Sequence, residues 1–128
     1  MVKKTPVVLV ADDEAPLLKL LRITFGLEGF EVVTASNGIE ALAAFEGHRP
    51  DAAVLDISMP GVDGFGVLEF IRQRSSIPVV MLTARDDAEC EARARAAGAS
   101  DFRRKPFDRQ ELTSLIKKRL EMAAGQTS

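Results

Sequence analysis

The stretch Val7-Val8-Leu9-Val10-Ala11-Asp12-Asp13 decides the fold of this chain. Its apolar residues form a run of the length typical of a buried strand, and two carboxylates follow the C-terminal end of that run. The same order recurs at three further places: 52–55 before Asp56, 79–82 before Thr83, and a weaker run, 99–104, before Lys105 and Pro106. Ligands of open α/β sheets bind outside the carboxyl ends of the strands, so we expect a site for a divalent cation and a phosphoryl group there.

Strand and helix patterns alternate five times along the chain, which predicts βαβ units around a parallel sheet. The strands are expected at about 7–11, 31–35, 51–56, 79–83 and 100–104. Four helices show apolar residues at helical spacing: Leu17, Leu20, Leu21 and Phe25, then Ala41, Leu42 and Phe45, then Phe65, Leu68 and Ile71, and last Leu112, Leu115, Ile116 and Leu120. The predicted fold class is α/β, a flavodoxin-like (βα)5 three-layer sandwich with a five-stranded parallel sheet in the order 2-1-3-4-5.

The helix expected at about 87–97 differs from the others because it contains no large apolar side chain. Its candidate inner residues are all small: Ala88, Cys90, Ala92, Ala94, Ala96 and Ala97. A buried alanine contributes far less free energy than a buried leucine, so this helix is expected to be the most loosely packed element. Weakly packed elements open at low cost in free energy, which makes this helix a candidate for a conformational switch.

The composition is that of one ordinary globular domain. The 128 residues suffice for a single core, expected over about 7–121, and the small polar tail 122–128 is expected to be frayed. A net charge of −2 gives no general case for binding nucleic acid or a membrane surface. No apolar run approaches the ~20 residues of a membrane span. Cys90 is the only cysteine, which excludes an internal disulfide and fits a reducing, cytoplasmic location.

The three aspartates at the expected strand ends have simpler interpretations when each is taken alone. Asp12 and Asp13 suit the N-cap of the following helix, and Asp56 suits a turn. If the first and third strands are neighbours, however, the three carboxylates face one another, and their repulsion raises their pKa values and costs stability. Because Mg²⁺ favours oxygen ligands, retains waters and bridges to phosphate, we expect it at Asp12, Asp13 and Asp56.

A carboxylate can also act as a nucleophile and form an aspartyl phosphate, provided that positive charges surround the incoming oxygens. Taken alone, Thr83 is most simply a β-branched strand residue, and Lys105 is most simply a solvated charge. At the ends of neighbouring strands, the Thr83 hydroxyl can donate to a phosphoryl oxygen and the Lys105 ammonium can pair with it. Asp56 is therefore the expected phosphoacceptor.

Four motifs resemble those of a known family: Val8-Leu9-Val10-Ala11-Asp12-Asp13-Glu14, Leu55-Asp56-Ile57-Ser58-Met59-Pro60-Gly61-Val62-Asp63-Gly64, Leu82-Thr83-Ala84 and Lys105-Pro106-Phe107. In this order and at this spacing, the chain resembles the receiver domain of bacterial two-component response regulators from Val7 to about Leu120. The resemblance implies that Asp56 accepts a phosphoryl group from a histidine kinase or a histidine phosphotransfer protein. The chain would then be no ordinary enzyme, since it catalyses only its own phosphorylation and dephosphorylation.

The same resemblance implies roles for the residues around Asp56. Asp13, Asp56 and the backbone carbonyl of Ser58 would ligate Mg²⁺, with Asp12 acting largely through water. Thr83 and Lys105 would contact the phosphoryl oxygens, and the Lys105-Pro106 bond would be cis. Ser58 and Arg85 match positions that flank the site and tune dephosphorylation.

The resemblance further implies a switch in which phosphorylation draws Thr83 toward Asp56 and lets Phe102 turn inward. Helix 87–97, strand 100–104 and the helix after Asp108 would then form the face that contacts an output domain or a downstream protein. The expected state is a monomer or a phosphorylation-dependent dimer, without direct nucleic-acid or membrane binding. Basic residues gather in this region and suggest an electropositive surface: Arg93, Arg95, Arg103, Arg104, Arg109, Lys117, Lys118 and Arg119.

Three other functions fit the residues less well. A hydrolase of the haloacid-dehalogenase type needs a second aspartate two residues after the nucleophile, where this chain has Ser58. A receiver-like module that is never phosphorylated would not require the complete set of acidic residues, Thr83 and Lys105. A flavodoxin-like cofactor carrier would have a hydroxyl-rich loop after the first strand, and the chain has no Trp or Tyr to stack on a flavin.

Overall fold

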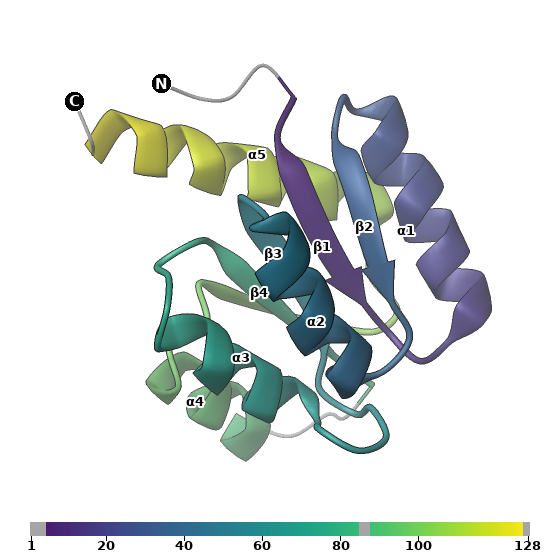
Figure 1. The fold of residues 1–128 in the computed structure, drawn as a ribbon, viewed down its shortest axis with the longest axis vertical. Helices are drawn as coiled ribbons and strands as arrows, with labels where there is room; N and C mark the ends of the chain where they lie inside the picture. Colours follow the sequence, from purple (N-terminus) through teal and green to yellow (C-terminus); the bar gives the residue numbers. More distant parts are fainter. Residues whose placement is uncertain (1–4, 85–87, 127–128) are drawn as a thin grey trace.

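The structure, a computed structural model of the chain, describes residues 5–84 and 88–126. Five strands alternate with five helices in this part of the chain (Figure 1). Their bounds are β1 Val7–Ala11, α1 Ala15–Leu27, β2 Glu31–Ala35, α2 Gly38–His48, β3 Ala52–Asp56, α3 Gly64–Arg72, β4 Val79–Thr83, α4 Ala88–Ala96, β5 Asp101–Arg104 and α5 Arg109–Gln126. The strands form one parallel sheet in the order β2-β1-β3-β4-β5, which confirms the predicted α/β fold.

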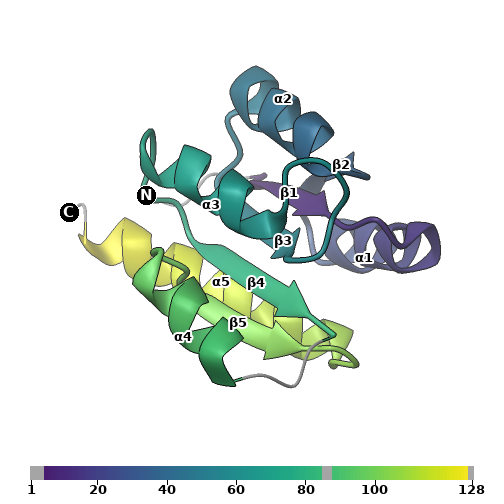
Figure 2. The same cartoon turned by 90° about the horizontal axis from the view of Figure 1, so that it is seen from below.

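Alternate residues of the central strands face opposite sides of the sheet, because the side-chain period of a strand is two. On one side, Leu9, Leu55 and Met81 join a core cluster with residues of α2, α3 and α4. On the other side, Val10 and Val54 pack with residues of α1 and α5. Figures 1 and 2 show the resulting three layers, with α1 and α5 on one side of the sheet and α2 and α3 on the other.

The parallel register brings the ends of the central strands to one edge of the sheet. Ala11 at the end of β1 lies opposite Leu55, one residue before Asp56. Asp56 lies opposite Leu82, one residue before Thr83. The predicted gathering of polar side chains at the carboxyl ends of these strands is therefore confirmed as a consequence of sheet order and register.

Two details of helix packing differ from the expectation. Leu20 is 44% exposed, because α1 turns only a narrow stripe, centred on Leu21 and Phe25, toward the sheet. In α4 the buried residues are Cys90 and Ala94, which are four residues apart on one face, whereas the other alanines expected inside are exposed or half-buried. The low apolar content of the α4 interface is thus confirmed, but fewer residues form it than the sequence suggested.

The last helix, α5, continues to Gln126 and so includes residues 122–126 of the tail that was expected to be frayed. Alanine is the residue that most favours a helix, and Ala123 and Ala124 carry the helix through the region expected to be frayed. No helix in the described residues is both long enough and apolar enough to cross a membrane.

Two glycines fix the β3–α3 connection, which begins directly after Asp56. A Cβ atom at Gly64 would lie 2.4 Å from the backbone oxygen of Asp56, so α3 starts in close contact with the end of β3. A Cβ atom at Gly38, the first residue of α2, would lie 1.8 Å from the backbone oxygen of Val62. The connection therefore packs so closely against α2 and the start of α3 that only glycine fits at positions 38 and 64.

The Gly38→Ala variant is expected to lose about 1–3 kcal/mol of unfolding free energy in urea denaturation, because its methyl group must displace the Val62 backbone. Gly47→Ala, in the same helix, is the matched control: a Cβ atom there meets nothing within 4 Å. The control should gain up to about 1 kcal/mol from the better helix propensity of alanine. Equal stability changes in the two variants would contradict this account of the connection.

Candidate functional site

Three carboxylates meet at the edge of the sheet where β1 and β3 end. Asp12, Asp13 and Asp56 each offer a ligand oxygen, and these oxygens lie within 4.8 Å of one another. Asp12 is fully buried, Asp56 is 3% exposed, and Asp13 is exposed. The predicted acidic cluster is thus present, with two of its charges inside the protein and the third open to solvent.

The two oxygens of Asp12 have different environments. Oδ1 accepts a hydrogen bond of 2.8 Å from the backbone N–H of Glu14. Because Glu14 is the N-cap residue of α1, Asp12 does not have the N-cap role that it could have taken alone. Oδ2 is buried and has no hydrogen-bond partner within the described residues. It lies 2.9 Å from Lys105 Nζ, in an ion pair whose geometry is not that of a hydrogen bond. Asp12 therefore retains a buried oxygen that a cation or a cation-bound water can use.

Lys105 reaches the cluster from the other side, from the residue after β5. Its backbone N–H donates to the Thr83 carbonyl at 2.7 Å, and the Lys105-Pro106 bond is cis, as the resemblance implied. Its ammonium forms hydrogen bonds with Asp56 at 3.3 Å and with Glu14 at 2.5 Å. Burial by itself lowers the pKa of Lys105, but its hydrogen bonds and charge interactions with the carboxylates outweigh burial and raise the pKa.

Asp56 shares the Lys105 ammonium with Asp12, which lies closer to that ammonium. The backbone N–H of Ser58 donates to Asp56 Oδ1 at 3.3 Å, which brings the start of the β3–α3 connection back over the side chain. Burial, followed by the charge of Asp12, raises the pKa of Asp56 from 3.8 to about 6, although Lys105 and the Ser58 N–H act in the opposite direction. The carboxyl is therefore held in an environment that opposes its charge and that an added cation would relieve.

The chemistry of the donor set fits Mg²⁺. Every side-chain ligand in the cluster is a carboxylate oxygen, as a hard divalent cation requires, and the exposed Asp13 leaves room for waters. The Asp12 Oδ2 atom, buried without a hydrogen bond in the described residues, is the kind of atom that coordination would satisfy. Geometry and donor type together thus support the predicted metal site at these residues.

Thr83, at the same edge of the sheet as the cluster, and Phe102, farther back in β5, are both inside the protein. Thr83 is the last residue of β4 and is fully buried. Phe102 is 5% exposed and belongs to the same core cluster as Cys90 and Ala94 of α4. The Phe102 ring is already inside the core. From this conformation, phosphorylation therefore cannot turn the ring inward, contrary to the expectation from the sequence. Arg85, the other flanking residue of interest, lies outside the described residues.

Four of the eight basic residues predicted to form the electropositive surface pair with acidic residues in the folded protein. Arg103 Nε lies 3.0 Å from Glu111, and Arg119 Nε lies 2.7 Å from Asp101. Two further pairs are Arg95 with Glu91 and Lys117 with Glu28. The expected electropositive surface is therefore weaker than the sequence suggested, because partners distant in sequence meet on the folded surface.

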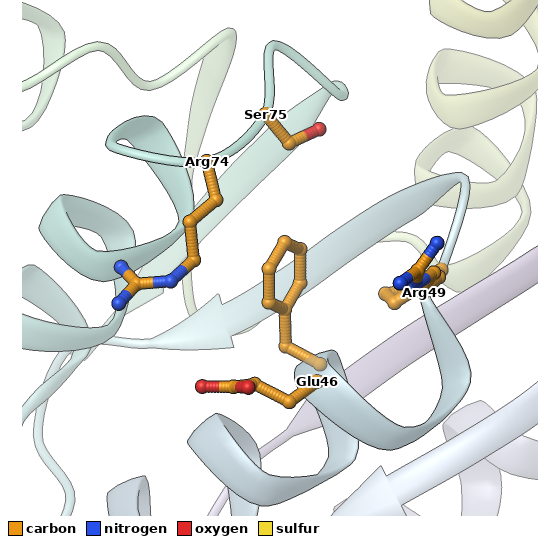
Figure 3. A pocket seen from close by; sticks show the side chains of 6 residues that line it. Glu46, Arg49, Arg74 and Ser75 are labelled. Atoms are coloured by element: carbon orange, nitrogen blue, oxygen red, sulfur yellow. The ribbon is translucent and has the colours of Figure 1, made fainter.

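A pocket of about 370 Å³ lies elsewhere, between the C-terminal ends of α2 and α3. Arg49 and Arg74 lie on opposite sides of it, with Glu46 and Ser75 also in its lining (Figure 3). Both arginines are near helix C-termini, where a positive charge interacts favourably with the helix dipole. The two arginines therefore stabilise the ends of the helices, which explains their position. None of the residues that line the pocket belongs to the carboxylate cluster.

Sequence reasoning assigned no role to Glu14. The structure places its carboxylate against Lys105, beside the two buried aspartates. The available signal was a third acidic residue directly after Asp12 and Asp13, but only the position of Lys105 in the fold shows which group Glu14 contacts. Asp12, Asp13, Asp56, Lys105 and Thr83, in contrast, lie at the strand ends where the sequence placed them.

The chain resembles known proteins over most of its length. A family model described as the response regulator receiver domain matches residues 8–117. A probable transcriptional regulator, ycf27, from Guillardia theta is 44% identical over 110 residues, which are 86% of this chain and 43% of that protein. The transcriptional regulatory protein KdpE of Mycobacterium tuberculosis is 40% identical over 86% of this chain and 49% of its own length. The chain thus spans about half the length of the curated relatives it matches.

Solved structures show the same fold. The receiver domain of the Francisella response regulator 1452 superposes with a TM-score of 0.88 at 31% identity, over 93% of this chain and 99% of that one. A CheY-like response regulator receiver domain protein from Methanospirillum hungatei gives a TM-score of 0.90 at 27% identity, over 95% of this chain and 98% of that one. Sequence and structure comparisons therefore agree on the family that these residues resemble.

The raised pKa of Asp56 predicts how stability varies with pH when Mg²⁺ is removed by EDTA. Between pH 3.8 and about 6 the folded protein holds a proton that the unfolded chain has lost. The contribution of Asp56 to the free energy of unfolding therefore falls by on the order of 2 kcal/mol as the pH rises through this window. Asp56→Asn, which cannot ionise, should lack this fall, so its stability relative to wild type should increase from pH 4 to pH 7.

Urea denaturation of both proteins across this range measures the difference. Asp63→Asn is a suitable control, because Asp63 is an exposed residue that caps α3 and asparagine caps equally well. Saturating Mg²⁺ should flatten the wild-type curve, since the cation favours the ionised carboxylate. A stability difference between wild type and Asp56→Asn that is constant with pH would refute the assigned environment of Asp56.

Proposed function

The chain belongs to the family of response regulator receiver domains, and from this premise we propose that Asp56 accepts a phosphoryl group from a phosphorylated histidine, with Mg²⁺ bound beside it. The donor would be a sensor histidine kinase or a histidine phosphotransfer protein. As a receiver domain the chain is a signalling protein in a two-component system rather than an ordinary enzyme. The identity of the phosphorylated residue, the metal ligands and the output are the parts that we propose.

One observation carries the proposal: at the carboxyl edge of the sheet, Asp56 contacts an ammonium and lies in a cluster with two other carboxylates. In the reaction, an Asp56 oxygen forms a bond to phosphorus as the bond between phosphorus and the donor nitrogen breaks. The negative charge on the phosphoryl oxygens must be neutralised during this transfer. Lys105, 3.3 Å from Asp56, supplies one positive charge.

Asp13, Asp56 and the carbonyl of Ser58 would hold Mg²⁺, with Asp12 acting through a water. When bound, the cation would neutralise charge on the carboxylates and on the incoming phosphoryl group. The Ser58 N–H already contacts Asp56 Oδ1, so the loop that supplies the carbonyl is folded against the acceptor. Asp12 supports the assignment because its buried Oδ2 atom lacks a hydrogen bond in the described residues.

We propose that α4, β5 and α5 form the surface that transmits the signal to an output domain or a downstream protein. Thr83 ends β4 directly beside Asp56, and a shift of Thr83 toward a phosphoryl group would be felt first at the connection to α4. α4 has only Cys90 and Ala94 as buried residues among its described side chains, so it opposes such a shift weakly. Because Phe102 is already buried, we assign the switching movement to Thr83 and α4, with Phe102 as their packing partner.

The partners follow from the family. Relatives named as transcriptional regulators are about twice as long as this chain, which supports a proposal that the signal controls transcription through an output domain or a downstream protein. A cytoplasmic location would suit a histidine kinase donor. The receiver would act as a monomer or as a dimer that forms on phosphorylation, and this chain would contact neither nucleic acid nor membrane directly.

Incubation with acetyl phosphate and Mg²⁺ should add one phosphoryl group, detected by intact-protein mass spectrometry. Asp56→Asn should abolish this addition, because an amide is not a nucleophile for phosphoryl transfer. Asp63→Asn serves again as the control, since it alters a nearby exposed aspartate of the same connection, and it should be modified as fast as wild type. An undiminished adduct on Asp56→Asn would mean that another residue is the acceptor.

A further inference from the structure

We propose that Glu14 is a positioning residue that holds the Lys105 ammonium at the outer side of the carboxylate cluster and thereby restrains phosphorylation of Asp56. The proposal rests on the proposed function of Asp56. It concerns regulation within the same site: Glu14 would set how readily Lys105 becomes available to a phosphoryl group.

The distances around the ammonium carry the argument. Lys105 Nζ lies 2.5 Å from Glu14, 2.9 Å from Asp12 and 3.3 Å from Asp56. The shortest contact is thus with the exposed partner, since the Glu14 side chain is 58% exposed and the other two are buried. Lys105 itself is 12% exposed, so its ammonium lies at the boundary between the buried carboxylates and solvent.

The local structure directs the Glu14 side chain to Lys105 and not to a helix-capping hydrogen bond. It is the N-cap residue of α1, a position where short side chains such as serine and aspartate normally accept a hydrogen bond from the helix. Within the described residues, the Glu14 side chain makes no capping hydrogen bond. Its backbone N–H is held by Asp12 Oδ1 at 2.8 Å, which fixes the residue while its carboxylate extends to Lys105.

A phosphoryl group on Asp56 would compete with Glu14 for Lys105. An ammonium has three N–H donors, and here three carboxylates surround it. Asp12 and Asp56 are also the groups proposed to face Mg²⁺, and the cation would weaken their attraction for Lys105. Glu14, outside that cation site, keeps its full charge and remains the competitor that Lys105 must leave.

Glu14→Gln should therefore take up a phosphoryl group from acetyl phosphate and Mg²⁺ about two- to fivefold faster than wild type. A larger factor is not expected, because a pair with one exposed partner contributes little. The rate is followed by intact-protein mass spectrometry at a fixed donor concentration. After removal of the donor, the adduct on Glu14→Gln should be lost no faster than on wild type, since Lys105 stays with the phosphoryl group.

Two control variants separate the contact from a general charge effect. Glu28→Gln makes the same charge change at the far end of α1, where Glu28 pairs with Lys117, and should match wild type. Glu14→Asp keeps the charge but withdraws the carboxylate by one methylene, so it should resemble Glu14→Gln. If Glu14→Asp instead behaves like wild type while Glu14→Gln is faster, the effect is repulsion of the anionic donor, and the proposed positioning role is wrong.

The remaining outcomes distinguish this inference from the function on which it rests. A wild-type protein that acquires no phosphoryl group would overturn the proposed function itself. A wild-type protein that is modified on Asp56 at the same rate as Glu14→Gln would leave that function intact and overturn only the role of Glu14. Faster modification of both Glu14 variants, with Glu28→Gln unchanged, would support the proposal.

Discussion

The constraint on which the rest of this structure depends is the repulsion among carboxylates at one edge of the sheet. Asp12, Asp13 and Asp56 offer oxygens within 4.8 Å of one another, and two of these side chains are buried. One ammonium, that of Lys105, offsets part of this charge. The imbalance that remains favours binding of a cation, and burial together with the charge of Asp12 raises the pKa of Asp56 to about 6. The stable fold thus contains a cluster of mutually repelling carboxylates that a bound cation would stabilise.

The fold supplies the rigid frame that keeps these charges together. The central strands have buried apolar residues on both faces, and packing there holds β1, β3 and β4 in register. α4 is the contrasting element, because it is attached through small side chains such as Cys90 and Ala94. The closely packed sheet would therefore resist a structural change caused by a new charge at Asp56, whereas the weakly packed α4 would resist it little. We expect the largest displacement at α4 for this reason.

Much of this arrangement could be predicted from the sequence, because runs of apolar residues mark the strands and parallel strands end at a common edge. The sheet order itself was predicted from the flavodoxin-like fold class. Given that order, the meeting of Asp12, Asp56 and Lys105 follows from those two facts. The contact of Glu14 with Lys105 could not be predicted, since it joins residues 91 positions apart through side-chain geometry. The exposure of Leu20 also escaped prediction, because helical spacing does not reveal how wide a stripe the sheet will cover.

A crystal structure with Mg²⁺ and beryllofluoride, a stable mimic of a phosphoryl group, tests the central claim most directly. The account predicts the mimic on Asp56, the cation at Asp13, Asp56 and the Ser58 carbonyl, and Lys105 turned from Glu14 to the fluorine atoms. Thr83 should approach the mimic, with displacement of the chain confined mainly to the region between β4 and β5. A mimic bound away from Asp56, or a cation that leaves all three aspartates without a contact, would contradict the account.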